Sequence, residues 1–229
     1  MIWIIFMLAL LACIVLPGLW VKRVLAKYGE PANRYRDKGS GADLARHLLE
    51  RFDMADVRVE ETDRGDHYDP KDKAVRLSPN NFSGYSLTAV TVAAHEVGHA
   101  IQDARGEALF KARQRLVVAA TRAQRFGQIV LLLAPLVLLV ARLPGLSVVM
   151  LLIALLSVAV STLVHLVTLP VELDASFGKA LPILEEGRYL YDGDLPHAQK
   201  ILRAAAFTYV AGSLSSLLSL GRWLTVLRR

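Results

Sequence analysis

Residues 87–105 read LTAVTVAAHEVGHAIQDAR, and the rest of the chain is organised around them. The apolar residues in this stretch predict one helix from Leu87 to about Arg105. His95 and His99 are four residues apart, so their side chains share one helix face with about 5–6 Å between the Cβ atoms. Two imidazoles at this spacing can bind one zinc ion at about 2.0–2.1 Å.

Glu96 is turned about a quarter of the helix circumference away from His95. It can therefore stand beside the metal without ligating it and take a proton from a zinc-bound water. This is the H-E-x-x-H pattern, whose mechanism is zinc hydrolysis with a glutamate general base. The alternative is a surface helix that carries two histidines by chance. The apolar residues around His95 weigh against it, because polar groups in so apolar a helix must be paired, hydrated or metal-bound.

The composition points to a membrane protein. The chain is 54% hydrophobic, which is too apolar for an ordinary soluble domain, and its apolar residues form long runs. The net charge is +6, but the basic residues flank the apolar runs and do not form a patch with interleaved aromatics. That pattern is typical of membrane orientation and excludes a nucleic-acid partner. The single cysteine, Cys13, excludes an internal disulfide and is compatible with a reducing compartment.

The apolar runs divide the chain into five segments. Basic residues lie at both ends of the second segment, which the positive-inside rule therefore places on the cytoplasmic side, with the N-terminus outside. The segments are a transmembrane anchor at 2–21, a cytoplasmic zincin-like domain at 22–125, a transmembrane hairpin at 126–171, a third-ligand segment at 172–203 and a membrane-embedded or membrane-packed helix at 204–222. We therefore expect an α+β fold, a mostly helical integral membrane protein with a small cytoplasmic domain.

Two further patterns lie in the second segment. Ser40 is placed to cap a helix that runs to about Phe52. Alternating residues at 57–60 and 74–78 predict two short strands, as a β-hairpin or sheet edge just before the zinc helix. Such an edge can hold an extended peptide by strand addition. An ordinary hairpin that covers a core is the open alternative.

A catalytic zinc needs three protein ligands and an open position. Glu172 lies where the second helix of the predicted transmembrane hairpin emerges beside the zinc helix. Asp174 is about 200° further around the helix, so the two carboxylates cannot both face the metal. Gly98 lacks a side chain and can allow a close helix crossing. Asp174 is then expected to bond the second nitrogen of a histidine. The downstream candidates for the third ligand are His165, Glu172, Asp174 and His197.

Three runs resemble a known family: HYDPKDKAVRLSP at 67–79, AAHEVGHAIQ at 93–102 and LPVELDAS at 169–176. Together they resemble the bacterial membrane-bound zinc-dependent peptidases of the YugP type, over nearly the whole chain, and more distantly the HtpX and CAAX-prenyl protease group. The resemblance implies metal ligands at His95, His99 and Glu172, and a base at Glu96. It departs at Ser176, where the HtpX group has an aspartate that orients a histidine.

The expected function is a membrane-anchored zinc metalloendopeptidase with one Zn²⁺ per chain, at the cytoplasmic face of a bacterial plasma membrane. Its expected partners are the lipid bilayer and a protein or peptide substrate, while membrane-protein partners and self-association stay open. One alternative is a site-2-type intramembrane protease with Asp174 as third ligand. Another is a non-catalytic scaffold stapled by zinc.

His165 is expected to line the site or to bond a neighbouring helix. The oxyanion stabiliser stays open among polar candidates, which are His67, Tyr68, Tyr189, Tyr191 and His197.

Overall fold

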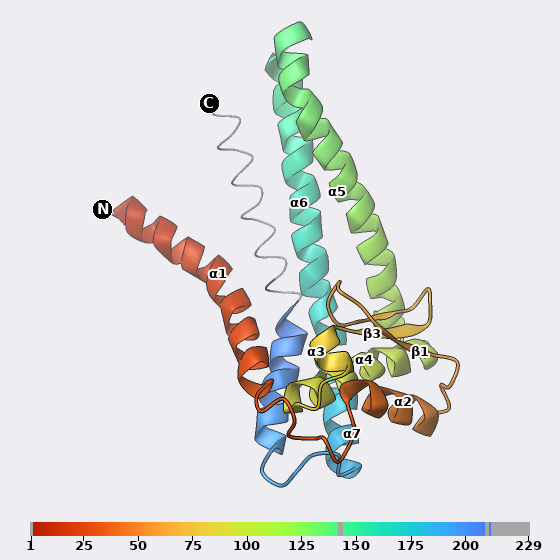
Figure 1. The fold of residues 1–229 in the computed structure, drawn as a ribbon. Coiled ribbons are helices and arrows are strands. Elements are labelled where there is room, and N and C mark those ends of the chain that lie inside the picture. Colours follow the sequence, from red (N-terminus) through yellow and green to blue (C-terminus); the bar gives the residue numbers. More distant parts are fainter. Residues whose placement is uncertain (1, 142–143, 209–210, 212–229) are drawn as a thin grey trace.

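The computed structural model describes residues 2–141, 144–208 and 211, and it is mostly helical with one small sheet (Figure 1). A helical stretch at 195–208 follows the last labelled element. The elements are α1 (Ile2–Tyr28), α2 (Gly41–Arg51), β1 (Arg58–Glu61), β2 (His67–Asp69), β3 (Ala74–Leu77), α3 (Pro79–Phe82), α4 (Leu87–Ala104), α5 (Ala108–Ala141), α6 (Pro144–Leu173), the π-helix η1 (Asp174–Ala180) and α7 (Leu181–Glu186).

The zinc-motif helix α4 forms the centre of the body of the molecule. Every residue from Leu87 to Gln102 is buried, as expected for a helix that is apolar on nearly all sides. Its N-terminus is capped by Ser86, whose Oγ accepts a hydrogen bond from the backbone nitrogen of Ala89 at 3.1 Å. The helix predicted over 87–105 is confirmed.

Helix α2 packs against α4 and is also confirmed. Ser40 and Asp43 form a capping box at its start, in which each side chain accepts from the backbone nitrogen of the other residue. The apolar face of α2 carries Leu44, Leu48 and Leu49, which are buried in the core around α4.

The sheet has three strands in the order β1-β3-β2. β1 runs parallel to β3, and β2 runs antiparallel to it, with Tyr68 opposite Val75. The two predicted strands are present, but they pair in parallel and are not the two arms of one hairpin. The hairpin is β2–β3, and β2 was not predicted because it has only three residues inside a polar, Asp- and Gly-rich stretch.

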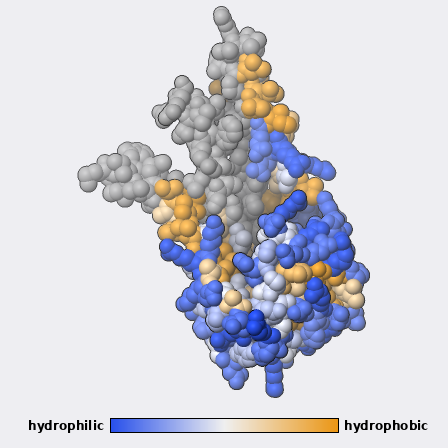
Figure 2. Space-filling model, viewed as in Figure 1, coloured by the Kyte–Doolittle hydropathy of each residue, from blue (hydrophilic) through white to orange (hydrophobic). Residues whose placement is uncertain are grey.

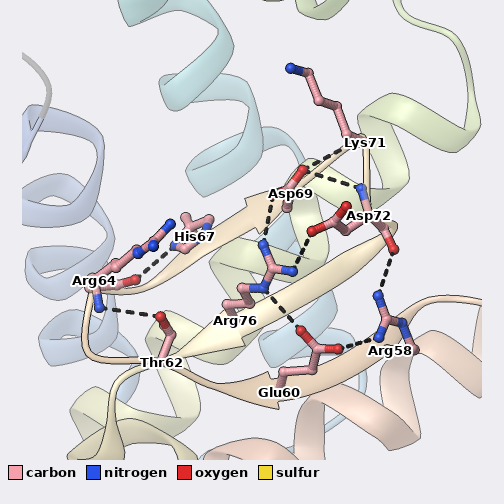
Figure 3. A network of polar contacts seen from close by, with 10 residues as sticks. Arg58, Glu60, Thr62, Arg64, His67, Asp69, Lys71, Asp72 and Arg76 are labelled. Atoms are coloured by element: carbon pink, nitrogen blue, oxygen red, sulfur yellow. Dashed lines mark hydrogen bonds and ion pairs between the residues drawn. The ribbon is translucent and has the colours of Figure 1, made fainter.

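One arginine ties the three strands together (Figure 3). The Arg76 guanidinium on β3 lies 3.0 Å from Glu60 on β1, 2.7 Å from Asp69 on β2 and 2.5 Å from Asp72 in the turn. Arg58 adds an ion pair to Glu60 at 2.5 Å. These polar contacts hold the edge strand β2 to the rest of the sheet.

Helices α5 and α6 form a packed pair that projects from the body (Figure 1). The predicted turn between them falls on residues 142–145, of which 142–143 lie outside the described residues. α5 begins well before the apolar run, so the basic residues expected to precede the run are part of the same helix. Figure 2 shows apolar residues on the projecting helices and hydrophilic residues over most of the body.

The predicted integral membrane fold is wrong for the part of the chain that the structure describes. Within those residues, none of the helices is both long and apolar enough for a membrane crossing. The apolar runs at 2–21 and within 126–171 belong to longer helices that continue into charged residues, such as Lys27 in α1, Arg113 in α5 and Glu172 in α6. Most of the helix predicted at 204–222 lies outside the described residues.

Candidate metal centre

Three buried side chains from two helices converge at one point. His95 and His99 project from α4, and Glu172 comes from the last turn of α6. Their candidate ligand atoms all lie within 4.8 Å of one another, so the cluster could hold a metal ion. Glu172 Oε2 is 3.4 Å from His95 Nε2 and 3.2 Å from His99 Nε2.

This donor set fits zinc. Two ligand atoms that each stand about 2.0–2.1 Å from a tetrahedral ion are about 3.3 Å apart, which matches both nitrogen–oxygen separations. Two imidazoles and one carboxylate are also among the donor sets of catalytic zinc, in which the fourth position stays open for water.

A glutamine fixes the proton position on His99. Gln102 Nε2 donates to the Val171 carbonyl at 3.0 Å and to Asp174 Oδ2 at 2.7 Å, and both of these groups only accept. The other end of the amide, Oε1, is therefore the acceptor that lies 2.9 Å from His99 Nδ1. His99 therefore donates from Nδ1, and its other ring nitrogen, Nε2, is the one that faces Glu172 and is placed to bind a metal.

A serine does the same for His95. The Ser176 hydroxyl donates to the Leu202 carbonyl at 3.1 Å, so its oxygen accepts from His95 Nδ1 at 3.0 Å. Nε2 of His95 is thereby also directed at Glu172. Ser176 thus occupies the position, and performs the orienting task, that the HtpX resemblance assigns to an aspartate.

The close approach of α4 and η1 explains how one segment delivers both Glu172 and Ser176. A Cβ on Gly98 would lie 2.7 Å from the Ala175 carbonyl oxygen, so only glycine permits this distance without a shift. The crossing predicted at Gly98 is present. Glu172 in the last turn of α6 and Ser176 in η1 are four residues apart, so they lie nearly on one helix face, which presents both side chains to α4.

Glu96 lies next to this cluster and is itself buried, at 6% exposure. Burial raises the pKa of Glu96 to about 7, with the charges of Asp66 and Glu172 acting in the same direction. For Glu172, burial also acts to raise the pKa, but the charges of His99 and Arg113 and hydrogen bonds from both histidines outweigh it, and the pKa lies below its usual value. The two carboxyl groups of the site are therefore held in different environments.

A cavity of about 300 Å³ opens onto the cluster. Part of its lining is the polar loop that leads into β2, and a more apolar part comes from α1, α4 and the helical stretch at 195–208. The lining residues are Leu25, Arg64, Gly65, Asp66, His67, Tyr68, Val92, His95, Glu96, His99, Arg113, Glu172, Ala205 and Thr208.

The other predicted site residues lie in different places, and among those whose side chains the structure describes only His67 and Tyr68 join the three ligands and Glu96 at the cavity. His67 and Tyr68 line the cavity, where Tyr68 donates to Asp103 at 2.9 Å. Asp174 differs from the expectation, because it bonds Gln102 and Lys179 and supports His99 only through the glutamine. His165 lies in α6, and its side chain is outside the described part of the chain. The remaining candidates do not line the cavity. The Tyr189 hydroxyl is hydrogen-bonded to His47, the Tyr191 hydroxyl donates to Asp37, and the His197 ring stacks on Tyr28.

Sequence reasoning missed three residues that contact the ligands. Gln102 follows His99 by three helix positions, which is a signal that side-chain contact rules could have found. Ser176 was noticed only as a departure from the HtpX pattern. Arg113, whose Nη2 lies 2.9 Å from Glu172 Oε1, was one member of a basic cluster with nothing to single it out.

Comparison with known proteins gives two matches. The model of a family described as "Putative neutral zinc metallopeptidase" matches residues 2–228. The chain is also 38% identical over 191 residues to the "Putative membrane protease YugP" of Bacillus subtilis (strain 168), an alignment that covers 82% of this chain and 80% of that protein. No solved structure matches the chain.

Proposed function

The chain belongs to this zinc metallopeptidase family, as its three motif runs predict, and we propose that it is a zinc-dependent endopeptidase with its reaction centre at His95, His99 and Glu172. The observation that carries the proposal is the orientation of the two histidines. The Nδ1 atom of each ring donates to Gln102 or Ser176, so the Nε2 atoms of both rings face Glu172 Oε2.

The residues of the site then have distinct tasks. His95, His99 and Glu172 would hold the ion, which when bound would supply Lewis acidity for activating water and polarising a peptide carbonyl. Glu96 accepts the proton of the attacking water as general base and passes it to the leaving amine. Its position in the cavity beside both histidines supports this role.

The edge strand β2 supports an extended substrate. Its residues His67 and Tyr68 line the cavity, and β2 pairs with β3 on one side, at the end of the sheet order. A peptide laid along the other side of β2 gains backbone hydrogen bonds and passes the metal cluster. His67 is then the better placed oxyanion candidate, because the Tyr68 hydroxyl is committed to Asp103.

Two alternatives have less support. In the site-2-type alternative Asp174 is the third ligand, but its Oδ2 bonds Gln102 and Lys179 at 2.7 Å each. In the scaffold alternative the zinc site is closed, and structural zinc usually takes four Cys or His ligands. Only three metal-ligating side chains converge among the described residues, and a buried Glu96 has no task in a scaffold.

The proposed place of action is a lipid surface. The Bacillus relative is named a membrane protease. Large apolar side chains are exposed along α5 and α6, with Leu132 at 71% and Leu156 at 65%, and extended exposed apolar surface marks protein or membrane contact. We expect purified protein to float with lipid vesicles in a density gradient and the Leu132→Gln/Leu156→Gln variant to float less. Wild-type protein that stays at the bottom would argue against lipid contact.

The general-base role is tested by Glu96→Gln. The carboxamide fills the same volume but cannot take a proton from water, so zinc content should stay at the wild-type level. Peptide cleavage should fall by roughly 10²–10⁴-fold, the usual contribution of general acid–base catalysis. Zinc content and cleavage are measured on the same preparation, with the exposed Glu50→Gln as matched control.

The ligand assignment is tested on the same panel. Glu172→Ala should lose zinc and cleavage together, whereas Asp174→Ala should weaken metal affinity by about 10–100-fold, because it acts through Gln102. Loss of zinc in Asp174→Ala with retention in Glu172→Ala would favour the site-2-type alternative. Cleavage at the wild-type rate by Glu96→Gln would refute its role as base.

A further inference from the structure

The two oxygens of Glu172 have different surroundings. Oε2 faces the Nε2 atoms of both histidines, at 3.4 and 3.2 Å. Oε1 points the other way and lies 2.9 Å from Arg113 Nη2, in an ion pair without hydrogen-bond alignment. Glu172 is fully buried, so its negative charge depends on the charged and polar groups beside it.

Arg113 is itself held in place. Its side chain is 12% exposed and comes from the first turns of α5, one turn after Phe110. The guanidinium lies 5.9 Å from the centre of the Phe110 ring, and this ring is 6.0 Å from the ring of His99. Phe110 is 3% exposed, so it forms a rigid support between the arginine and the metal histidines.

We propose that Arg113 is a positioning residue that holds Glu172 in a one-oxygen orientation toward the metal. The inference rests on the proposed function, because it needs a metal at the cluster. With Oε1 engaged by the guanidinium, only Oε2 faces the two histidines and would be presented to a metal bound there. Without Arg113, a buried carboxylate oxygen has no cation beside it, and the carboxylate is free to turn both oxygens to the metal.

The orientation also explains why arginine serves better than lysine here. Arginine keeps its charge in any surroundings and presents it on a rigid planar fork, whereas lysine is a flexible point charge. Arg113 also lines the cavity, so contact with substrate is the competing role. The two roles predict different measurements, because a substrate contact leaves metal affinity unchanged.

The test compares Arg113→Met with Arg113→Lys, and uses the exposed Arg115→Met on the same helix as matched control. Zinc affinity is measured by competition with a chromogenic chelator. Arg113→Met should bind zinc about 10–100-fold more weakly, and Arg113→Lys should fall between it and the wild type. The absorption spectrum of the cobalt-substituted protein should change in Arg113→Met, since the carboxylate changes its mode of binding, and should not change in the control.

Two results would overturn the inference. Arg113→Met with wild-type zinc affinity and cobalt spectrum removes the positioning role, and a raised KM in the same variant assigns Arg113 to the substrate instead. If Arg113→Met does not fold, as circular dichroism of the metal-free protein would report, wild-type zinc affinity in Arg113→Lys overturns the need for a planar fork. Wild-type protein that binds no zinc is a separate outcome, because it refutes the proposed function itself.

Discussion

At the scale of single residues, the site depends on hydrogen bonds behind the ligands. Ser176→Ala removes the acceptor of the His95 Nδ1 proton and leaves that buried donor without a partner. The ring then loses its fixed tautomer and orientation, and we expect metal affinity to fall by about 10–100-fold. Chelator competition measures the change, with the exposed Ser83→Ala as control. An unchanged affinity would mean that packing alone orients His95.

The same residues mark how far the sequence predicts the site. His95, Glu96 and His99 follow from spacing on one helix, which is a local property. Glu172 follows from a family resemblance and from its place at a helix end. Contacts such as Ser176 to His95 join residues far apart in the chain, and nothing in their local pattern shows that η1 crosses α4. The expected task of Asp174 was therefore given to the wrong residue.

At the scale of elements, the crossing of α4 and η1 determines whether the ligands meet. Gly98→Ala places a methyl group 2.7 Å from the backbone oxygen of Ala175. Overpacking of this kind costs about 1–3 kcal/mol, against roughly 1 kcal/mol gained in helix propensity. We expect net destabilisation in thermal unfolding and weaker zinc binding, because η1 must move away from the histidines.

Gly145 is the matched control for this variant. It lies at the start of α6, and a Cβ at this position would meet nothing within 4 Å. Gly145→Ala should therefore be neutral or stabilising by up to about 1 kcal/mol. Equal effects of the two substitutions would show that the crossing tolerates a methyl group.

The elements also differ in how well the sequence predicts them. α2 and α4 carry caps and strong helical periodicity, and both occur where these signals place them. β2 is too short to show alternation, and its pairing with β3 is fixed by ion pairs from Arg76 to acidic residues of neighbouring segments. The long apolar runs favoured membrane spans. The helices that contain these runs extend further, into charged residues, and the runs alone do not show that those residues belong to the same helix.

At the scale of the whole molecule, a bound metal would tie α4 to the end of α6, joining residues 73 positions apart. An ion that binds the folded chain alone stabilises it by about 2.7 kcal/mol at 100 times its Kd. For a chain of this length, we expect its removal by a chelator to lower Tm by about 5–10 °C. Scanning calorimetry with and without chelator measures the shift, and added zinc should restore it.

The Glu172→Ala variant separates this effect from a general action of the chelator. It lacks the ligand that connects α6 to α4, so its Tm should be lower than that of the zinc-loaded wild type and insensitive to chelator. Glu50→Gln, on the surface of α2, should keep the full wild-type response. A wild-type Tm that is the same with chelator and with saturating zinc would mean that the three side chains do not hold a metal in the folded protein. In that case the convergence of His95, His99 and Glu172 would have to be explained by the Arg113 ion pair and the histidine hydrogen bonds alone.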